Sequence, residues 1–171
     1  MVFNGEIYNH LELREELASR IWRGHSDTET LLAAFERWGI EATLKKCVGM
    51  FAIALWDREG RVLTLARDRL GEKPLFYGWQ GETLLFGSEL KALKAHPAFG
   101  AEIDRDALAL FLRHNAVPTP YSIYRGIRKL PPGTFLQLHA GQKDPQPVAY
   151  WSARLVAEAG QRNLFRGNDR E

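Results

Sequence analysis

The sequence predicts an α+β protein in which antiparallel sheet packs against layers of helices. Two amphipathic helical patterns come first, within residues 9–38. The hydrophobic period then changes, and two hairpin patterns follow within residues 50–86. A helical period returns after residue 88. Strands that follow one another in sequence, flanked by runs of helices, are typical of this class. The 171 residues suffice for one domain with a sizeable core.

The N-terminal half begins with a short β-favouring run, Val2 and Phe3, which leads into Asn4-Gly5-Glu6. A helix is predicted over residues 9–21, because Leu13, Leu17 and Ile21 recur at intervals of four. Residues 26–29, Ser-Asp-Thr-Glu, form a capping-box sequence that starts a second helix. We expect that helix to run to about residue 38 and to end at the glycine that follows.

The middle of the chain predicts two hairpins, with strands at residues 50–56 and 61–66 and then at 75–79 and 83–86. The first strand is apolar without alternation, so both of its faces should be covered. Beyond Pro97, Asp104 can cap a helix whose Leu108, Phe111 and Leu112 are expected to face inward. Residues 133–139 alternate as an outer strand, and a loop follows at 141–147.

Composition excludes several classes of function. The net charge of +2 is too balanced for a protein of nucleic-acid or anionic-membrane surfaces. No apolar stretch approaches membrane-spanning length, and the start is not a signal peptide. Cys47 is the only cysteine, which excludes an intrachain disulfide and fits a reducing, cytoplasmic setting. The five histidines show no ligand spacing, so no metal site is predicted.

Asn4, Gly5 and Glu6 are the first candidate site. Asn4 can offer a side-chain N–H and Gly5 an open backbone N–H, and two donors that converge on one point would stabilise an oxyanion. The alternative is a β-turn, because Asn-Gly is a common turn dipeptide. Asp27 is the second candidate, either as a first-turn acid that suits the helix dipole or as a carboxylate that holds a ligand ammonium.

The charged loop of Arg67, Asp68, Arg69 and Lys73 is either a solvated turn or a partly buried structural lock between the hairpins. Burial is favoured by the apolar strands on both sides. Cys47 could be a nucleophile, but it precedes a buried strand and has no histidine near it in sequence. We therefore interpret it as a buried structural thiol.

Six segments, in order, resemble the glutaminase domain of asparagine synthetase, a class II glutamine amidotransferase with the N-terminal-nucleophile hydrolase fold. The segments are FNGEIYNHLELREEL (residues 3–17), HSDTETLL (25–32), GMFAIALWD (49–57), ARDRLGEKPLFYG (66–78), FGSELKAL (86–93) and YRGIRKLPPG (124–133). The resemblance implies an αββα sandwich, incomplete at its N-terminus, with a partial glutaminase domain over residues 1–140. Residues 141–171 would link it to an ATP-binding synthetase domain.

The resemblance also implies roles for the candidate residues. Asn4 and Gly5 match the oxyanion donors, Glu6 matches a glutamine-binding residue, and Asp27 matches the carboxylate that holds the glutamine α-ammonium. Glutamine would be hydrolysed, and its ammonia used to amidate aspartate. ATP and magnesium would serve the following domain, with no cofactor in this chain, and a homodimer of the full-length enzyme is allowed.

One departure from the family pattern concerns the nucleophile. The family uses an N-terminal cysteine, whereas Val2 follows Met1 here and Cys47 matches a core position. The family's arginine-containing segment that grips the glutamine carboxylate has no counterpart either. We therefore expect a truncated, inactive glutaminase. Alternatives are the glutaminase domain of a sugar- or surface-polysaccharide-related amidotransferase, or a non-catalytic glutamine-binding domain.

Overall fold

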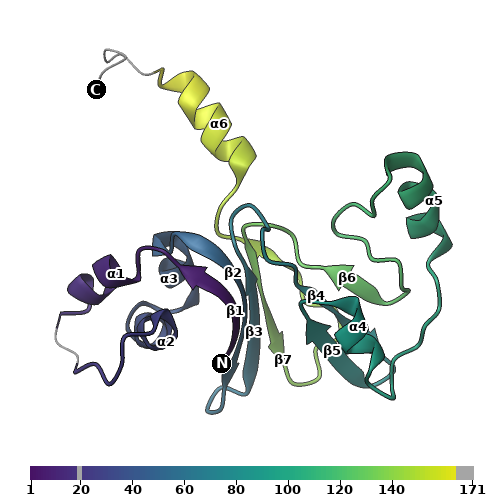
Figure 1. Ribbon diagram of the computed structural model, residues 1–171, viewed down its shortest axis with the longest axis horizontal. Coiled ribbons are helices and arrows are strands. Elements are labelled where there is room, and N and C mark those ends of the chain that lie inside the picture. Colours follow the sequence, from purple (N-terminus) through teal and green to yellow (C-terminus); the bar gives the residue numbers. More distant parts are fainter. Residues whose placement is uncertain (19–20, 165–171) are drawn as a thin grey trace.

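The computed structural model describes residues 1–18 and 21–164, which form a layered α+β body. Five strands make one antiparallel sheet in the order β1-β2-β3-β7-β8, and three make a second sheet in the order β5-β4-β6 (Figure 1). Helices α1, α2 and α3 cover the outer face of the first sheet, and α4 lies against the second. The predicted αββα arrangement is confirmed.

The elements follow the predicted order. The strands are β1 Val2–Ile7, β2 Gly49–Asp57, β3 Val62–Arg67, β4 Phe76–Gln80, β5 Thr83–Gly87, β6 Ile127–Lys129, β7 Thr134–His139 and β8 Val148–Ala149. The helices are α1 His10–Glu16, α2 Asp27–Trp38, α3 Ile40–Lys46, α4 Leu90–Lys94, α5 Arg105–His114 and α6 Ala153–Arg162. Both predicted hairpins are present, and they lie in different sheets because β3 pairs onward with β7 instead of with β4.

Strand β2 is covered on both faces, as its unbroken apolar run predicted. Phe51 and Ile53 pack into the cluster beneath the helices. Ala52 and Ala54 belong to the cluster between the two sheets. Because successive strand residues face opposite sides, one strand supplies both cores. The small alanines on the inner face suit the close approach of a second sheet.

The loop between the two hairpins is held by hydrogen bonds between its charged side chains and the surrounding main chain. Asp68 is fully buried, and its carboxylate accepts hydrogen bonds from four main-chain N–H groups at 2.9–3.2 Å. The donors belong to Phe51, Leu70, Glu72 and Lys73. The carbonyl oxygen of Asp68 also accepts from Gly71 and Gly133. One buried residue therefore joins β2, the loop and the start of β7.

Arg67 complements that arrangement from the donor side. Its buried guanidinium donates to the carbonyl oxygens of Lys73, Leu130 and Gly71 at 2.6–2.8 Å. The hydroxyl of Tyr150 donates in turn to the carbonyl of Arg67, at 2.8 Å. Arg69 extends outward and donates to the carbonyl of Lys45 at the end of α3. The charges of Arg67 and Asp68 are thus satisfied by main-chain groups, whereas the buried Nε of Arg69 has no hydrogen-bond partner among the described residues. Lys73 takes part through its backbone.

Three local predictions are wrong. Helix α1 ends at Glu16 instead of residue 21, and Ile21 is 93% exposed. Arg14 explains the early end, because its guanidinium donates to the carbonyls of Gly24 and Ser26 and so holds the returning chain against the helix. Strand β7 is not an outer strand, because β8 pairs along its second edge. The third wrong prediction is that the apolar residues of α5 face inward.

Helix α5 begins at the predicted cap, where the Asp104 carboxylate accepts from the N–H groups of Asp106 and Ala107. Its apolar residues, however, face solvent: Leu108, Phe111 and Leu112 are 39%, 44% and 74% exposed. Only Ala107 is buried, because α5 stands at the end of the body and no described element covers its apolar stripe.

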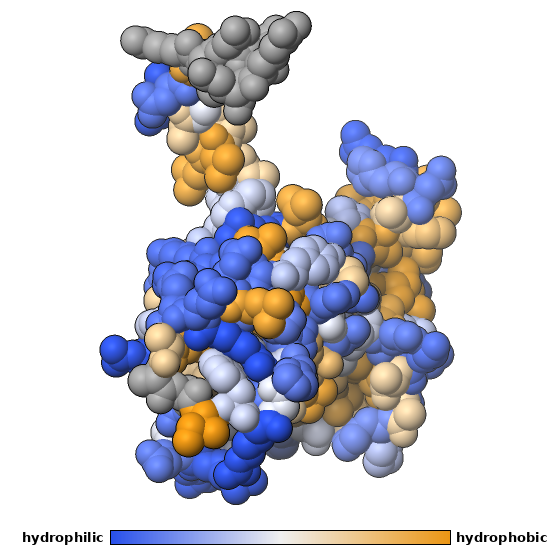
Figure 2. Space-filling model, turned by 60° about the vertical axis from the view of Figure 1, so that its left-hand side comes forward, coloured by the Kyte–Doolittle hydropathy of each residue, from blue (hydrophilic) through white to orange (hydrophobic). Residues whose placement is uncertain are grey.

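Helix α6 projects away from both sheets and buries none of its residues. Figure 2 shows apolar side chains on this helix, where Leu155 and Val156 are each more than half exposed. Among the described helices none is both long and apolar enough to cross a membrane.

We predict that Asp68→Asn destabilises the protein by at least about 3 kcal/mol, because an amide cannot accept from all four N–H groups and each buried unsatisfied donor costs about 1–3 kcal/mol. Urea unfolding followed by circular dichroism measures this. Asp57→Asn is the matched control: that exposed carboxylate accepts from two turn N–H groups, and its loss should cost less than about 1 kcal/mol. Equal losses in both variants would contradict the role given to Asp68.

Candidate functional site

The site is built on β1, an edge strand of the first sheet. Asn4, Gly5 and Glu6 lie in the middle of this strand, so the β-turn alternative for Asn-Gly is wrong. A side chain on Gly5 would clash with β2, because a Cβ there would lie 2.1 Å from the carbonyl oxygen of Met50. Glycine is therefore required for close strand approach, and not for a turn.

Strand pairing fixes the direction of each N–H of β1. The Tyr8 N–H donates to Val48 of the neighbouring segment, whereas the Ile7 N–H points away from the sheet to the carboxylate of Asp27. Inward and outward N–H groups alternate along an antiparallel edge strand. Because the register pairs Asn4 with Ala52 and Glu6 with Met50, the Gly5 N–H also points outward.

The side chains of β1 divide between two faces. Phe3 and Ile7 pack beneath the helices, whereas Asn4 and Glu6 face the opposite side, where both are exposed. The amide of Asn4 donates to the hydroxyl of Ser88 at 2.9 Å, across from the end of β5. The side chains of Asn4 and Ser88 help to line a cavity of about 120 Å³, whose apolar walls include Ala52 and Leu75. One amide N–H of Asn4 is left for another acceptor.

Asp27 reaches the same strand edge from the helical layer. It is the first residue of α2, and the Ser26 hydroxyl caps that helix by accepting from the Glu29 N–H at 3.4 Å. One carboxylate oxygen of Asp27 accepts from Ile7 at 3.0 Å, and the other has a 3.5 Å contact with the Thr28 hydroxyl. This second oxygen is free for a stronger donor, such as an ammonium group.

The four candidate residues thus gather at one edge. Asn4 and Glu6 come from one face of β1, Asp27 comes from the helices behind it, and the Gly5 N–H lies between them along the strand. Ser88 was missed by sequence reasoning. Its segment, FGSELKAL, carried part of the family resemblance. No local sequence pattern, however, indicated that the Ser88 hydroxyl accepts a hydrogen bond from Asn4, which lies 84 residues away in the chain.

Cys47 lies outside this arrangement. It is 1% exposed, inside the core beneath the helices. Burial raises the pKa of its thiol from 9.0 to about 12, an effect that the positive charge of Arg69 offsets only in part. The thiolate is the nucleophilic form, so Cys47 is an inert structural thiol at neutral pH.

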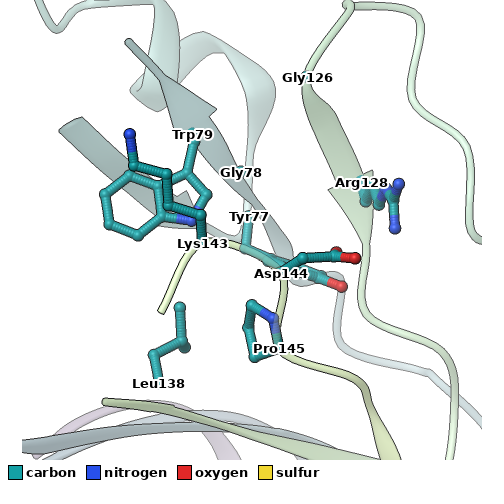
Figure 3. A pocket seen from close by; sticks show the side chains of 9 residues that line it. All are labelled: Tyr77, Gly78, Trp79, Gly126, Arg128, Leu138, Lys143, Asp144 and Pro145. Carbon is teal, nitrogen blue, oxygen red and sulfur yellow. The ribbon is translucent and has the colours of Figure 1, made fainter. Parts of the chain in front are cut away.

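No group of metal-ligating side chains large enough to hold an ion occurs in residues 1–18 and 21–164. A second cavity, of about 180 Å³, lies between the sheets near the loop that precedes β8. Figure 3 shows its lining, which includes Tyr77, Trp79, Arg128 and Asp144. It shares no residue with the cavity at Asn4.

Known proteins with similar sequences are glutamine-hydrolysing enzymes by name. A putative asparagine synthetase [glutamine-hydrolyzing] of Mycobacterium tuberculosis is 40% identical over 163 residues, which are 92% of this chain and 25% of that protein. Asparagine synthetase [glutamine-hydrolyzing] 3 of Bacillus subtilis is 42% identical over 138 residues, 77% of this chain and 22% of its own length. The chain therefore spans about a quarter of the length of these relatives.

Solved structures share the fold. The allosteric regulatory enzyme of purine biosynthesis superposes with a TM-score of 0.60 at 22% identity, over 87% of this chain and 28% of that one. Glutamine phosphoribosylpyrophosphate amidotransferase from B. subtilis gives a TM-score of 0.60 at 21% identity, over 88% of this chain and 28% of its own. The glutamine amidotransferase domain family matches residues 1–151, and the chain belongs to that family.

Proposed function

We propose that this chain is the glutamine-binding part of the glutaminase of an asparagine synthetase, which hydrolyses glutamine and uses the ammonia to amidate aspartate. The observation that carries the proposal is the outer edge of β1, where an outward Gly5 N–H lies between the Asn4 amide and the carboxylate of Asp27. The similarity to asparagine synthetases over most of the chain supports this choice of acceptor.

Each residue of the edge has a role that follows from its chemistry. Attack on the side-chain amide of glutamine gives a tetrahedral intermediate that carries a negative oxygen. The second amide N–H of Asn4 and the N–H of Gly5 would donate to that oxygen. The free oxygen of Asp27 would accept from the α-ammonium of glutamine, and Glu6 would accept from a further donor of the substrate.

The greater length of the relatives supports a covalently following synthetase domain. Under the proposal, that domain would bind ATP and magnesium, and no residue described here is assigned to them. A homodimer of the full-length enzyme and a cytoplasmic location belong to the same proposal. The domain boundary expected near residue 140 also remains a prediction.

We further propose that the 171-residue chain is inactive alone. Its only cysteine, Cys47, is buried with a raised thiol pKa, and the side chain of Val2 cannot attack a carbonyl. The purified chain should release glutamate from glutamine no faster than buffer, as measured by a coupled glutamate dehydrogenase assay. Glutamate release well above background, retained after repeated purification, would refute the proposed inactivity.

The roles at the β1 edge can be tested by restoring a nucleophile. A chimera with the cysteine-bearing N-terminal segment of a family member fused ahead of Val2 should hydrolyse glutamine. In the chimera, Asn4→Ala should lower kcat by about 10²–10³, the usual effect of removing one oxyanion-hole donor. Asp27→Asn should mainly raise KM, because the lost contact is with a part of glutamine that does not react.

Two matched controls accompany the chimera. Val2→Ala changes the same cavity wall without removing a donor, and Asp106→Asn removes an equivalent first-turn acid from α5. Both should retain activity within about threefold of the parent chimera. An Asn4→Ala chimera with unchanged kcat would contradict the oxyanion assignment. A folded, inactive parent chimera that binds glutamine would instead favour the non-catalytic glutamine-binding alternative.

A further inference from the structure

The cavity shown in Figure 3 is lined by residues of β4, β6 and β7 and of the loop that precedes β8. Leu138 of β7 forms its floor, and Tyr77 and Trp79 line it from the face of β4 that looks toward the first sheet. The loop before β8 closes the cavity with Asp144 and Pro145. The volume of about 180 Å³ would hold about six water molecules at their liquid volume.

Tyr77 is a largely buried residue that lines the cavity. Only 7% of the residue is exposed, but its hydroxyl is not among the buried polar atoms that lack a partner, so this oxygen reaches solvent through the cavity. The ring packs in the inter-sheet core while the residue lines the cavity, so a small molecule in the cavity can replace water as the hydrogen-bond partner of the hydroxyl.

Two opposite charges lie beside that hydroxyl. Arg128 of β6 is the direct cross-strand partner of Tyr77, and Figure 3 places it with Asp144 on the same side of the cavity. Both act on the phenol: burial raises the pKa of Tyr77, Arg128 lowers it and Asp144 raises it. Neither charge forms an ion pair with another residue in the described parts of the chain. One carboxylate oxygen of Asp144 accepts from the side-chain amide of Gln146 at 3.2 Å, and the cavity presents one cation and one anion without an opposite charge beside them in the described residues.

The opposite wall is apolar and its cation is already paired. The Trp79 ring lies there with the stem of Lys143, whose ammonium bonds to Glu82 at 2.7 Å. Gly78 and Gly126 approach closely at the back, where a Cβ on Gly78 would lie 1.9 Å from the Gly126 carbonyl. A ligand here meets two charges and a hydroxyl on one side and an indole face on the other.

We propose that this cavity binds a free α-amino acid. The carboxylate would accept from the Arg128 guanidinium and the Tyr77 hydroxyl, the ammonium would donate to Asp144, and the side chain would lie over Trp79 and Leu138. A zwitterion can pair with Arg128 and with Asp144 at the same time. A ligand with only a negative charge would pair with Arg128 but would be repelled by Asp144. The volume is well below the roughly 300–1,000 Å³ of pockets for larger cofactors and drug-sized ligands.

This site is independent of the proposed glutaminase function, because its residues lie apart from the β1 edge. The experiment is a titration of the ¹⁵N-labelled 171-residue chain with L-alanine, L-asparagine and L-glutamine, followed by ¹H–¹⁵N correlation spectra. At least one amino acid should shift the Trp79 indole and the amides near Arg128 and Asp144 in a saturable manner. The Asp27→Asn variant should give the same dissociation constant at this cavity.

Ligand analogues isolate the two charges. Alaninamide, which lacks the carboxylate, and N-acetylalanine, which lacks the ammonium, should each bind at least about tenfold more weakly than alanine, a difference of about 1.4 kcal/mol. For whichever amino acid binds best, Arg128→Gln and Asp144→Asn should weaken binding to a similar extent. Tyr77→Phe should weaken it by a smaller factor, because it removes a single hydroxyl.

Two exposed residues that do not line the cavity serve as matched controls. Arg125→Gln removes an exposed arginine that pairs with Glu102 at 2.7 Å outside the cavity, and Asp106→Asn removes an exposed acid. Both should leave binding unchanged. Arg128 and Asp144 are exposed, so their variants should melt at the temperature of the parent chain.

Three results would overturn the proposal. The first is the absence of saturable shifts with all three amino acids at millimolar concentrations. The second is equal binding of alanine and its two analogues, which would show that neither the carboxylate nor the ammonium of the ligand contributes to binding. The third is a set of shifts confined to the β1 edge and abolished by Asp27→Asn, which would assign the binding to the glutamine site and leave the inter-sheet cavity empty.

Discussion

The arrangement of the two sheets depends on the hydrogen bonds that main-chain N–H groups donate to the carboxylate of Asp68. An ionised group inside a protein is stable only when hydrogen bonds replace its water. Here four main-chain N–H groups do so, and they come from β2 and from the loop that leads to the second sheet. Arg67 satisfies carbonyl groups of the same region. The direction in which the chain leaves the first sheet is thereby fixed, and with it the position of β4 and β5.

That position matters at the far edge of the first sheet. Ser88 follows β5, and its hydroxyl accepts from the Asn4 amide. The helical layer acts on the same strand from behind, because Asp27 accepts from the Ile7 N–H. Strand β1 is therefore held by β2 along one edge and by single side-chain contacts elsewhere, while the outward N–H of Gly5 stays available. The geometry at the candidate oxyanion site depends on both layers.

Many elements of the fold could be predicted from the sequence. The features that could not be predicted depend on contacts between distant parts of the chain. Both hairpins, the two-faced burial of β2 and the helix cap at Ser26 follow from local periodicity and capping rules. Gly5 could not be interpreted correctly, because Asn-Gly favours turns in isolation and only pairing with β2 shows the need for close approach. Long-range contacts such as Asn4 with Ser88 leave no local pattern. The outward face of α5 was mispredicted because amphipathicity does not show whether a partner element is present.

The outer edge of β1 presents the Gly5 N–H for binding. Amide hydrogen exchange of the folded chain tests it residue by residue. We expect fast exchange at Gly5 and slow exchange at Asn4 and Glu6, whose N–H groups pair with β2. Ile7 should be protected in the parent and lose that protection in Asp27→Asn. Protection of Gly5 equal to that of Glu6 would show that this edge is closed and that the Gly5 N–H is not available to a ligand.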